Sequence, residues 1–218
     1  MSKLRIDVTG VPFHVFARGN NKQDIFFDEI DRLVFLKYCR EAKEQFDFRL
    51  FTYALMNNHF HLLLQMEKES SLAQLMQGIQ FQYARYINRK FRRVGHLFQG
   101  RYVNISVEKD AYFLTVDRYI HLNPVRAGMV ARPEDFPWSS YRARFENHKE
   151  DWLDHHAALD YFGNKREAQL EAYRKFTEEA MPSREDWSLE QLAKMTSLGS
   201  PRFHQQIKNR LLGAKEAT

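Results

Sequence analysis

The sequence predicts an α+β fold in which an antiparallel sheet packs against helices on one of its faces. Two observations carry this prediction. Segments rich in β-branched and aromatic residues alternate with segments whose apolar residues recur at helical spacing, in the order strand, helix, strand, strand, helix, strand, helix. The first six elements match the split βαβ sandwich of ferredoxin-like type, which would place the first and third strands at the centre of the sheet.

Each element follows from a local pattern. The first strand stops at the turn cluster Gly19-Asn20-Asn21, and Asn57-Asn58 suits a tight hairpin between the next two strands, because asparagine tolerates positive φ. A long helix is capped at Ser70-Ser71 and ended by Gly95. We expect strands over residues 11–18, 48–56, 59–66 and 97–107, and further helices over residues 28–46 and 110–123, the last ending before Pro124.

The pattern loosens after Gly128, so we divide the chain into a domain over residues 1–130 and a mainly helical C-terminal extension over residues 131–218. Helices are expected in the extension over residues 168–179, 189–195 and 203–212. The last forty residues hold two prolines and two glycines and could form a mobile tail. Such a tail could dock over an active site and regulate it.

Composition excludes several classes of protein. Hydrophobic residues make up 44% of the 218 residues, and no apolar run approaches the roughly 20 residues needed to span a bilayer. A single cysteine, Cys39, excludes an internal disulfide framework and a zinc site built on several cysteines. The chain starts without the apolar segment of a signal peptide. We therefore expect a cytoplasmic protein.

Positive charge is concentrated in one part of the chain, although the net charge is only +5. Residues 70–107 contain six basic residues and no Asp or Glu. A block of one sign in an otherwise balanced chain predicts a surface for a polyanion, and nucleic acid is the leading candidate. The alternative is a solvated helix face that happens to be basic.

His59-Phe60-His61 lies in a segment with the pattern of a buried strand. Side chains at i and i+2 of a strand share a face, so both imidazoles point the same way. Two neutral imidazoles side by side form half of a site for a divalent metal. The alternative is a half-buried polar pair without a metal. His14, on the first strand, could face the same site, and we interpret it as structural.

Tyr119 and Asn123 lie four residues apart and share one face of the last predicted helix. That helix can cross the open face of the sheet, toward which His59 and His61 point. Asn123 could then supply a third metal ligand through its amide oxygen, and Tyr119 a nucleophile. A phenol that attacks a phosphodiester gives a phosphotyrosine, and a His/His/amide set suits Mn²⁺ or Mg²⁺.

Five motifs, in order, resemble those of the REP-associated tyrosine transposases, a family of the one-tyrosine HUH superfamily of single-strand DNA transposases. They are Arg18-Gly19-Asn20-Asn21, residues 56–64 (MNNHFHLLL), residues 97–102 (LFQGRY), residues 118–128 (RYIHLNPVRAG) and residues 137–141 (PWSSY). The resemblance is close over about residues 5 to 145. One departure is Asn57, which stands where the family pattern usually has proline.

The resemblance implies a metal-dependent endonuclease and strand transferase that cuts single strands at REP-type DNA hairpins. It makes His59 and His61 the metal ligands and Tyr119 the nucleophile that takes the 5′ phosphate, with Asn123 where related transposases place a third ligand. A divalent ion, Mg²⁺ or Mn²⁺, is the implied cofactor. The resemblance also implies a monomer acting on the nucleoid, with a dimer as the alternative.

Basic and aromatic side chains near the motifs are candidate DNA contacts. Arg85, Arg89, Arg92 and Arg93 have helical spacing and would form one basic stripe. Arg101 and Tyr102 would pair a phosphate clamp with a base-stacking ring. Arg18 and Lys22 border the first turn and would read the hairpin or its flank.

Two other functions remain open. The same fold could serve as a hairpin DNA- or RNA-binding module whose nuclease activity is lost or unused. Such modules carry exposed aromatic residues on their central strands, where this chain has His59 and His61, which favours the enzyme. A metallohydrolase for small molecules is disfavoured by the basic segment and by the lack of a carboxylate near the histidines.

Overall fold

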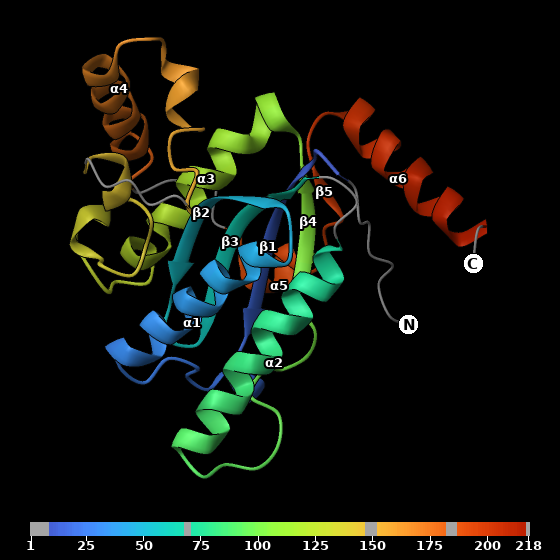
Figure 1. Cartoon of the computed structure of the whole chain (residues 1–218). Helices are drawn as coiled ribbons and strands as arrows, with labels where there is room; N and C mark the ends of the chain where they lie inside the picture. The colour runs from blue at the N-terminus through green and yellow to red at the C-terminus, as the bar shows by residue number, and fades with distance from the viewer. Residues whose placement is uncertain (1–8, 68–70, 147–151, 182–186, 217–218) are drawn as a thin grey trace.

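The computed structural model describes residues 9–67, 71–146, 152–181 and 187–216. Within these ranges a five-stranded sheet has the order β2-β3-β1-β4-β5 (Figure 1). The strands are β1 (Pro12–Arg18), β2 (Phe48–Leu55), β3 (His59–Met66), β4 (Val103–Val107) and β5 (Ser197–Leu198). The α+β prediction and the central position of the first and third strands are confirmed. None of the helices in the described ranges is both long and apolar enough to cross a membrane.

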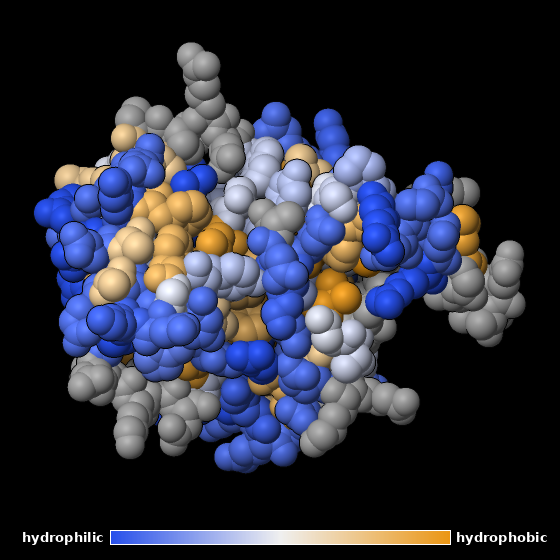
Figure 2. Space-filling model, turned by 90° about the horizontal axis from the view of Figure 1, so that it is seen from above, coloured by the Kyte–Doolittle hydropathy of each residue, from blue (hydrophilic) through white to orange (hydrophobic). Residues whose placement is uncertain are grey.

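The helices cover both faces of the sheet (Figure 1). One face carries α1 and α2, and α3 crosses the other, as expected for a helix that follows the fourth strand. Farther along, α6 stands out from one side of the body and exposes mostly hydrophilic residues (Figure 2). The helices are α1 (Glu29–Glu41), α2 (Leu72–Lys90), α3 (Lys109–Arg126), α4 (Arg166–Glu178), α5 (Leu189–Leu192) and α6 (Pro201–Glu216).

Alternation along the central strands separates two cores. Phe13 and Val15 of β1 pack in the core beneath α1 and α2. Phe16 packs with α3 in the second core. His14, two residues before Phe16, faces the same side of the sheet and contacts the Phe16 ring. Because side chains of a strand alternate between faces, the residues of β1 and β3 that build the first core leave the opposite face of these strands to other residues, His14 among them.

Several predicted boundaries are wrong for identifiable reasons. The long helix ends at Lys90, not at Gly95, because Arg92 adopts a φ of 50° and the Arg93 amide donates to the Asn88 carbonyl at 2.8 Å. This is a Schellman ending with arginine in the place that glycine usually fills, so the sequence carries no signal for it. Asn57 and Asn58 both have negative φ, so the turn between β2 and β3 does not use the conformation for which we expected asparagine.

Two boundaries near the third helix also differ. β4 begins only at Val103, and the expected strand before it is replaced by an irregular segment that is held to β1 by the Gln99 amide donating to the Arg18 carbonyl at 2.9 Å. α3 continues through Pro124 to Arg126, and Gly128, with a φ of 65°, then reverses the chain. Pro124 has no amide hydrogen to donate to the carbonyl of residue 120, and the helix ends two residues after it.

The end of the chain contributes to the sheet. β5 pairs parallel to β4 through Ser106 and Val107, so the sheet is mixed and not purely antiparallel. Leu192, Leu198 and Ile207 of this region are buried. A two-residue strand leaves no periodic pattern, which is why the sequence predicted helices and a mobile tail in this region but no strand.

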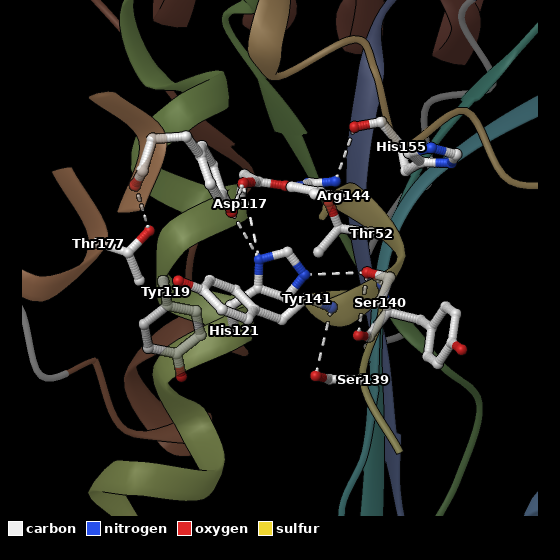
Figure 3. A network of polar contacts seen from close by, with 12 residues as sticks. Thr52, Asp117, Tyr119, His121, Ser139, Ser140, Tyr141, Arg144, His155 and Thr177 are labelled. Atoms are coloured by element: carbon white, nitrogen blue, oxygen red, sulfur yellow. Dashed lines mark hydrogen bonds and ion pairs between the residues drawn. The ribbon is translucent and has the colours of Figure 1, made fainter. Parts of the chain in front are cut away.

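A buried ion pair joins α3 to the rest of the molecule (Figure 3). Asp117 on α3 accepts hydrogen bonds from Arg144, from Thr52 of β2 and from Tyr173 of α4. Asp117 and Arg144 are both 0% exposed. Burial alone would raise the pKa of Asp117, but the charge of Arg144 and these hydrogen bonds hold it below its ordinary value.

His121 extends this network to the residues 137–141 motif. Its Nδ1 lies 2.7 Å from the Tyr173 hydroxyl, and its Nε2 lies 2.9 Å from the Ser140 hydroxyl (Figure 3). Tyr173 already donates its proton to Asp117, so His121 Nδ1 donates to Tyr173 and His121 Nε2 accepts from Ser140. The motif thus fixes the helix that carries Tyr119.

Asp117→Ala is expected to lower the free energy of unfolding by about 3–5 kcal/mol, because it leaves the Arg144 guanidinium buried without a partner charge. Urea unfolding measures this loss. Glu41→Ala, which removes the exposed pair between Lys37 and Glu41 on α1, is the control and should change stability by less than about 0.5 kcal/mol. Equal losses of unfolding free energy in the two variants would contradict the stabilising role of the pair between Asp117 and Arg144.

Candidate metal and nucleophile site

Three histidines lie together on the face of the sheet that α3 covers. His59 and His61 are on β3, and His14 is on the neighbouring strand β1. The ring of His61 lies 5.0 Å from each of the other two rings, measured between centroids. The alternation predicted for His59 and His61 therefore holds, and it brings in a third imidazole.

One ring nitrogen of each predicted ligand has a close partner. His59 Nδ1 lies 2.6 Å from the Asn58 side-chain oxygen, so it carries a proton and donates. His61 Nδ1 lies 2.8 Å from His14 Nε2. His61 Nε2 is buried and has no hydrogen-bond partner among the described residues. The Nε2 atoms of His59 and His61 are therefore the ones left to bind a metal.

Burial keeps these imidazoles neutral. It lowers the pKa of His14 to about 3, and it lowers the pKa of His59 to about 4 with a further contribution from the charge of Arg18. The pKa of His61 is also well below its ordinary value, mainly because of burial. Neutral imidazole is the form that binds metals, and an unpartnered buried nitrogen is a fitting ligand, so these residues suit a divalent ion.

Tyr119 reaches this site from α3. Its ring lies 5.8 Å from the rings of both His14 and His61, measured between centroids. The residue is only 4% exposed, and its hydroxyl donates to the Trp187 carbonyl at 2.9 Å. The structure therefore brings the predicted nucleophile to the predicted metal ligands, beneath a segment that precedes α5.

Asn123 lies one turn beyond Tyr119 on α3 and is half-buried. Its amide nitrogen donates to the Tyr119 carbonyl at 2.8 Å. This bond fixes the orientation of the side chain and uses its donor end. The amide oxygen is the end that remains for a metal, as a third ligand requires.

A further contact ties the start of α5 to two predicted DNA contacts. Arg18 Nη1 donates to Glu190 at 2.8 Å, and Lys22 Nζ lies 3.9 Å from the same carboxylate oxygen. The hydrogen bond from Arg18 is the main cause that lowers the pKa of Glu190. The Glu190 carboxylate thus lies close to both of these cations.

The predicted basic stripe is divided in the structure. Arg85 and Arg89 are exposed on α2, whereas Arg92 and Arg93 follow its end, so the four do not share one helix face. Arg101 is exposed in the segment before β4, but the Tyr102 ring is 4% exposed and belongs to the first core. Such burial does not fit a base-stacking ring.

Sequence reasoning missed a groove between α2 and the segment before β4. It has a volume of about 910 Å³, and Phe81 and Arg85 contribute to its wall. Phe81 is 61% exposed, and the guanidinium of Arg85 lies 5.6 Å from its ring centroid. A smaller groove of about 460 Å³, beside Arg18 and α5, shares residues 99–101 with it. An exposed aromatic within the basic segment was the available signal.

Comparison with known proteins shows which family this chain resembles. The family described as "Transposase IS200 like" matches residues 7–123. A protein of Haemophilus influenzae named "Putative REP-associated tyrosine transposase" is 25% identical over 166 residues, which cover 70% of this chain and 93% of that protein. A solved structure of a REP-associated tyrosine transposase bound to a REP hairpin matches with a TM-score of 0.58 at 16% identity, over 66% of this chain and 86% of that one.

The fold and the family match define a transposase. This chain belongs to the IS200-like transposase family, whose pattern covers more than half of it. The resemblance to REP-associated tyrosine transposases, drawn from the five motifs, is confirmed.

Proposed function

We propose that this protein is a metal-dependent single-strand DNA endonuclease and strand transferase that cuts at REP-type hairpins through a 5′-phosphotyrosine. The observation that carries the proposal is the contact of the Tyr119 ring with His61, whose Nε2 is buried without a partner among the described residues. The hairpin complex of the structural neighbour supports the same kind of substrate. We further propose a monomer that acts on cytoplasmic, nucleoid DNA.

The covalent step belongs to Tyr119. Its phenolic oxygen attacks the phosphorus, the bond from phosphorus to the 3′ oxygen breaks, and the products are a 5′-phosphotyrosine and a free 3′ hydroxyl. Attack of another 3′ hydroxyl on the phosphotyrosine reverses the step and joins the strands without ATP. A divalent ion, Mg²⁺ or Mn²⁺, would neutralise charge that develops on the phosphate oxygens.

His59 and His61 would hold this ion through their Nε2 atoms, and Asn123 through its amide oxygen. The hydrogen bond that His59 donates to the Asn58 side-chain oxygen orients His59, and the bond that Asn123 donates to the Tyr119 carbonyl orients Asn123. Because Tyr119 and Asn123 share α3, the buried pair between Asp117 and Arg144 would set the distance from the nucleophile to the ion.

The DNA strand would follow the two connected grooves. Arg18 lines the smaller groove and Arg85 the larger one. Lys22 lies near the Glu190 oxygen that Arg18 also contacts, and Arg89 is exposed one turn beyond Arg85 on α2. The Tyr119 hydroxyl is bonded to the Trp187 carbonyl, and Glu190 pairs with Arg18. The segment that holds Trp187 and Glu190 would therefore have to move before a strand reaches Tyr119.

The second candidate function is a hairpin-binding protein of the same fold that does not cut. The low exposure of Tyr119, 4%, is the observation that favours it. Covalent capture of DNA separates the two functions.

Tyr119→Phe is expected to abolish cleavage, by at least about a thousandfold, and to leave hairpin affinity nearly unchanged, because it removes only the attacking oxygen. The measurement is formation of a denaturant-resistant adduct with single-stranded hairpin DNA and Mn²⁺. Tyr161→Phe is the matched control, since it too removes a hydroxyl bonded to a backbone carbonyl, that of Lys109. An adduct that persists in Tyr119→Phe would show another nucleophile.

Arg89→Ala is expected to reduce the slope of log affinity against log salt by about 0.7–0.9, the value for one lost phosphate contact. Fluorescence anisotropy with a hairpin oligonucleotide at several salt concentrations measures it. Lys175→Ala on α4, which removes an exposed cation outside residues 70–107, should leave the slope unchanged. An unaltered slope in Arg89→Ala would remove this residue from the DNA surface.

Glu190→Gln is expected to strengthen binding of single-stranded DNA several-fold, because Arg18 and Lys22 lose a competing carboxylate. The same anisotropy titration measures this. Glu179→Gln, at the residue that follows α4, removes an exposed carboxylate that pairs with Lys175 and serves as the control. Weaker or equal binding in Glu190→Gln would mean that these cations do not meet DNA.

A further inference from the structure

His14 has a geometric relation to the metal site that no sequence motif indicates. It is 0% exposed, and its Nε2 lies 2.8 Å from Nδ1 of His61. Its other nitrogen, Nδ1, has no hydrogen-bond partner among the described residues. The two rings are nearly parallel, with an interplanar angle of 27°, so His61 is held against a neighbour on the adjacent strand.

One proton decides what His61 can do. Each neutral imidazole carries a single N–H, and the short contact needs one donor and one acceptor. If His14 Nε2 donates, His61 carries its own proton on Nε2, and that nitrogen cannot bind a metal. If His61 Nδ1 donates, its Nε2 presents a lone pair toward the site. The direction of this single hydrogen bond therefore selects between a closed and a receptive His61.

We propose that His14 is a positioning residue that accepts the His61 Nδ1 proton through its own Nε2 and so holds His61 Nε2 ready to bind a divalent metal. The inference rests on the metal site of the proposed function. Partners of this kind fix both the tautomer and the ring orientation of a ligating histidine. His59 has an equivalent partner in Asn58, so each of the two ligands has its Nδ1 proton taken by an adjacent acceptor.

The neighbours of His14 support this role over a purely structural one. Its ring contacts His61, Tyr119 and Phe16, with centroids 5.0 to 5.8 Å apart. A buried donor without a partner costs about 1–3 kcal/mol, and an apolar side chain in its place would avoid that cost. The hydrogen bond to His61 therefore explains why a histidine, and not an apolar residue, occupies this position.

The test measures metal affinity and tautomers in the full chain, without using cleavage. Mn²⁺ affinity is measured by electron paramagnetic resonance of the free ion, for the wild type, His14→Phe and His14→Gln. We expect His14→Phe to weaken Mn²⁺ binding by about 10- to 100-fold, the usual loss when such a partner is removed. His14→Gln should recover part of this loss, because its amide oxygen can accept the His61 proton.

A matched control separates this effect from the loss of a buried histidine. His155 is 3% exposed and also has a nitrogen without a partner among the described residues, but it belongs to the C-terminal extension. His155→Phe should leave Mn²⁺ affinity unchanged. Equal affinities in His14→Phe and the wild type would overturn the proposal. A wild type that binds no Mn²⁺ at the histidines would instead contradict the metal site itself.

The wild type alone supplies a second measurement in case His14→Phe does not fold. Long-range ¹H–¹⁵N correlation spectra of the chain labelled at histidine, with Zn²⁺ as a diamagnetic probe, report which ring nitrogen carries each proton. The expected result is a proton on Nδ1 of both His14 and His61. A proton on His14 Nε2, or Zn²⁺ bound directly to His14, would overturn the proposal.

Discussion

The contact between Asp117 and Arg144 is the interaction on which the rest of the site depends. It connects α3 to the segment that carries Arg144, and Thr52 of β2 and Tyr173 of α4 donate hydrogen bonds to the same Asp117 carboxylate. Tyr119 and Asn123 follow Asp117 within two turns of the same helix, so their positions over the sheet depend on this anchor. A buried ion pair is a costly way to add stability, but a broken one is strongly penalised, so it holds α3 in one position.

The two faces of the sheet differ in the residues that they bury. Apolar residues of β1 and β3 meet α1 and α2 and form a core of ordinary composition. The opposite face carries His14, His61 and their neighbours, polar groups that burial would destabilise unless they are bonded. Because a strand sends alternate residues to opposite faces, the first core can stabilise the fold while the opposite face holds the buried histidines and Tyr119.

Much of this arrangement was predictable from local patterns. The β3 range, the Ser71 cap of α2 and the approach of Tyr119 to the histidines follow from periodicity and spacing. The contacts of His14, Arg144 and Glu190 were not predictable, because each joins residues more than 25 positions apart with no shared motif. The burial of Tyr102 was not predicted either, because the sequence alone does not distinguish a tyrosine that packs in the core from an exposed tyrosine beside an arginine.

The residues after position 130 also determine how the sheet meets its surroundings. At β2, the Trp138 carbonyl accepts a hydrogen bond from the Leu55 amide, and the Ser140 and Asp154 amides donate to carbonyls of that strand. On the other side of the sheet, the Thr196 and Leu198 carbonyls accept hydrogen bonds from the Ser106 and Glu108 amides. The edges of β2 and β4 therefore both have neighbours supplied by residues after position 130. An open outer strand is a template for pairing with another chain. A fragment that stops at residue 130 would leave the edges of β2 and β4 unpaired at once, and we expect it to aggregate more readily than the longer chain.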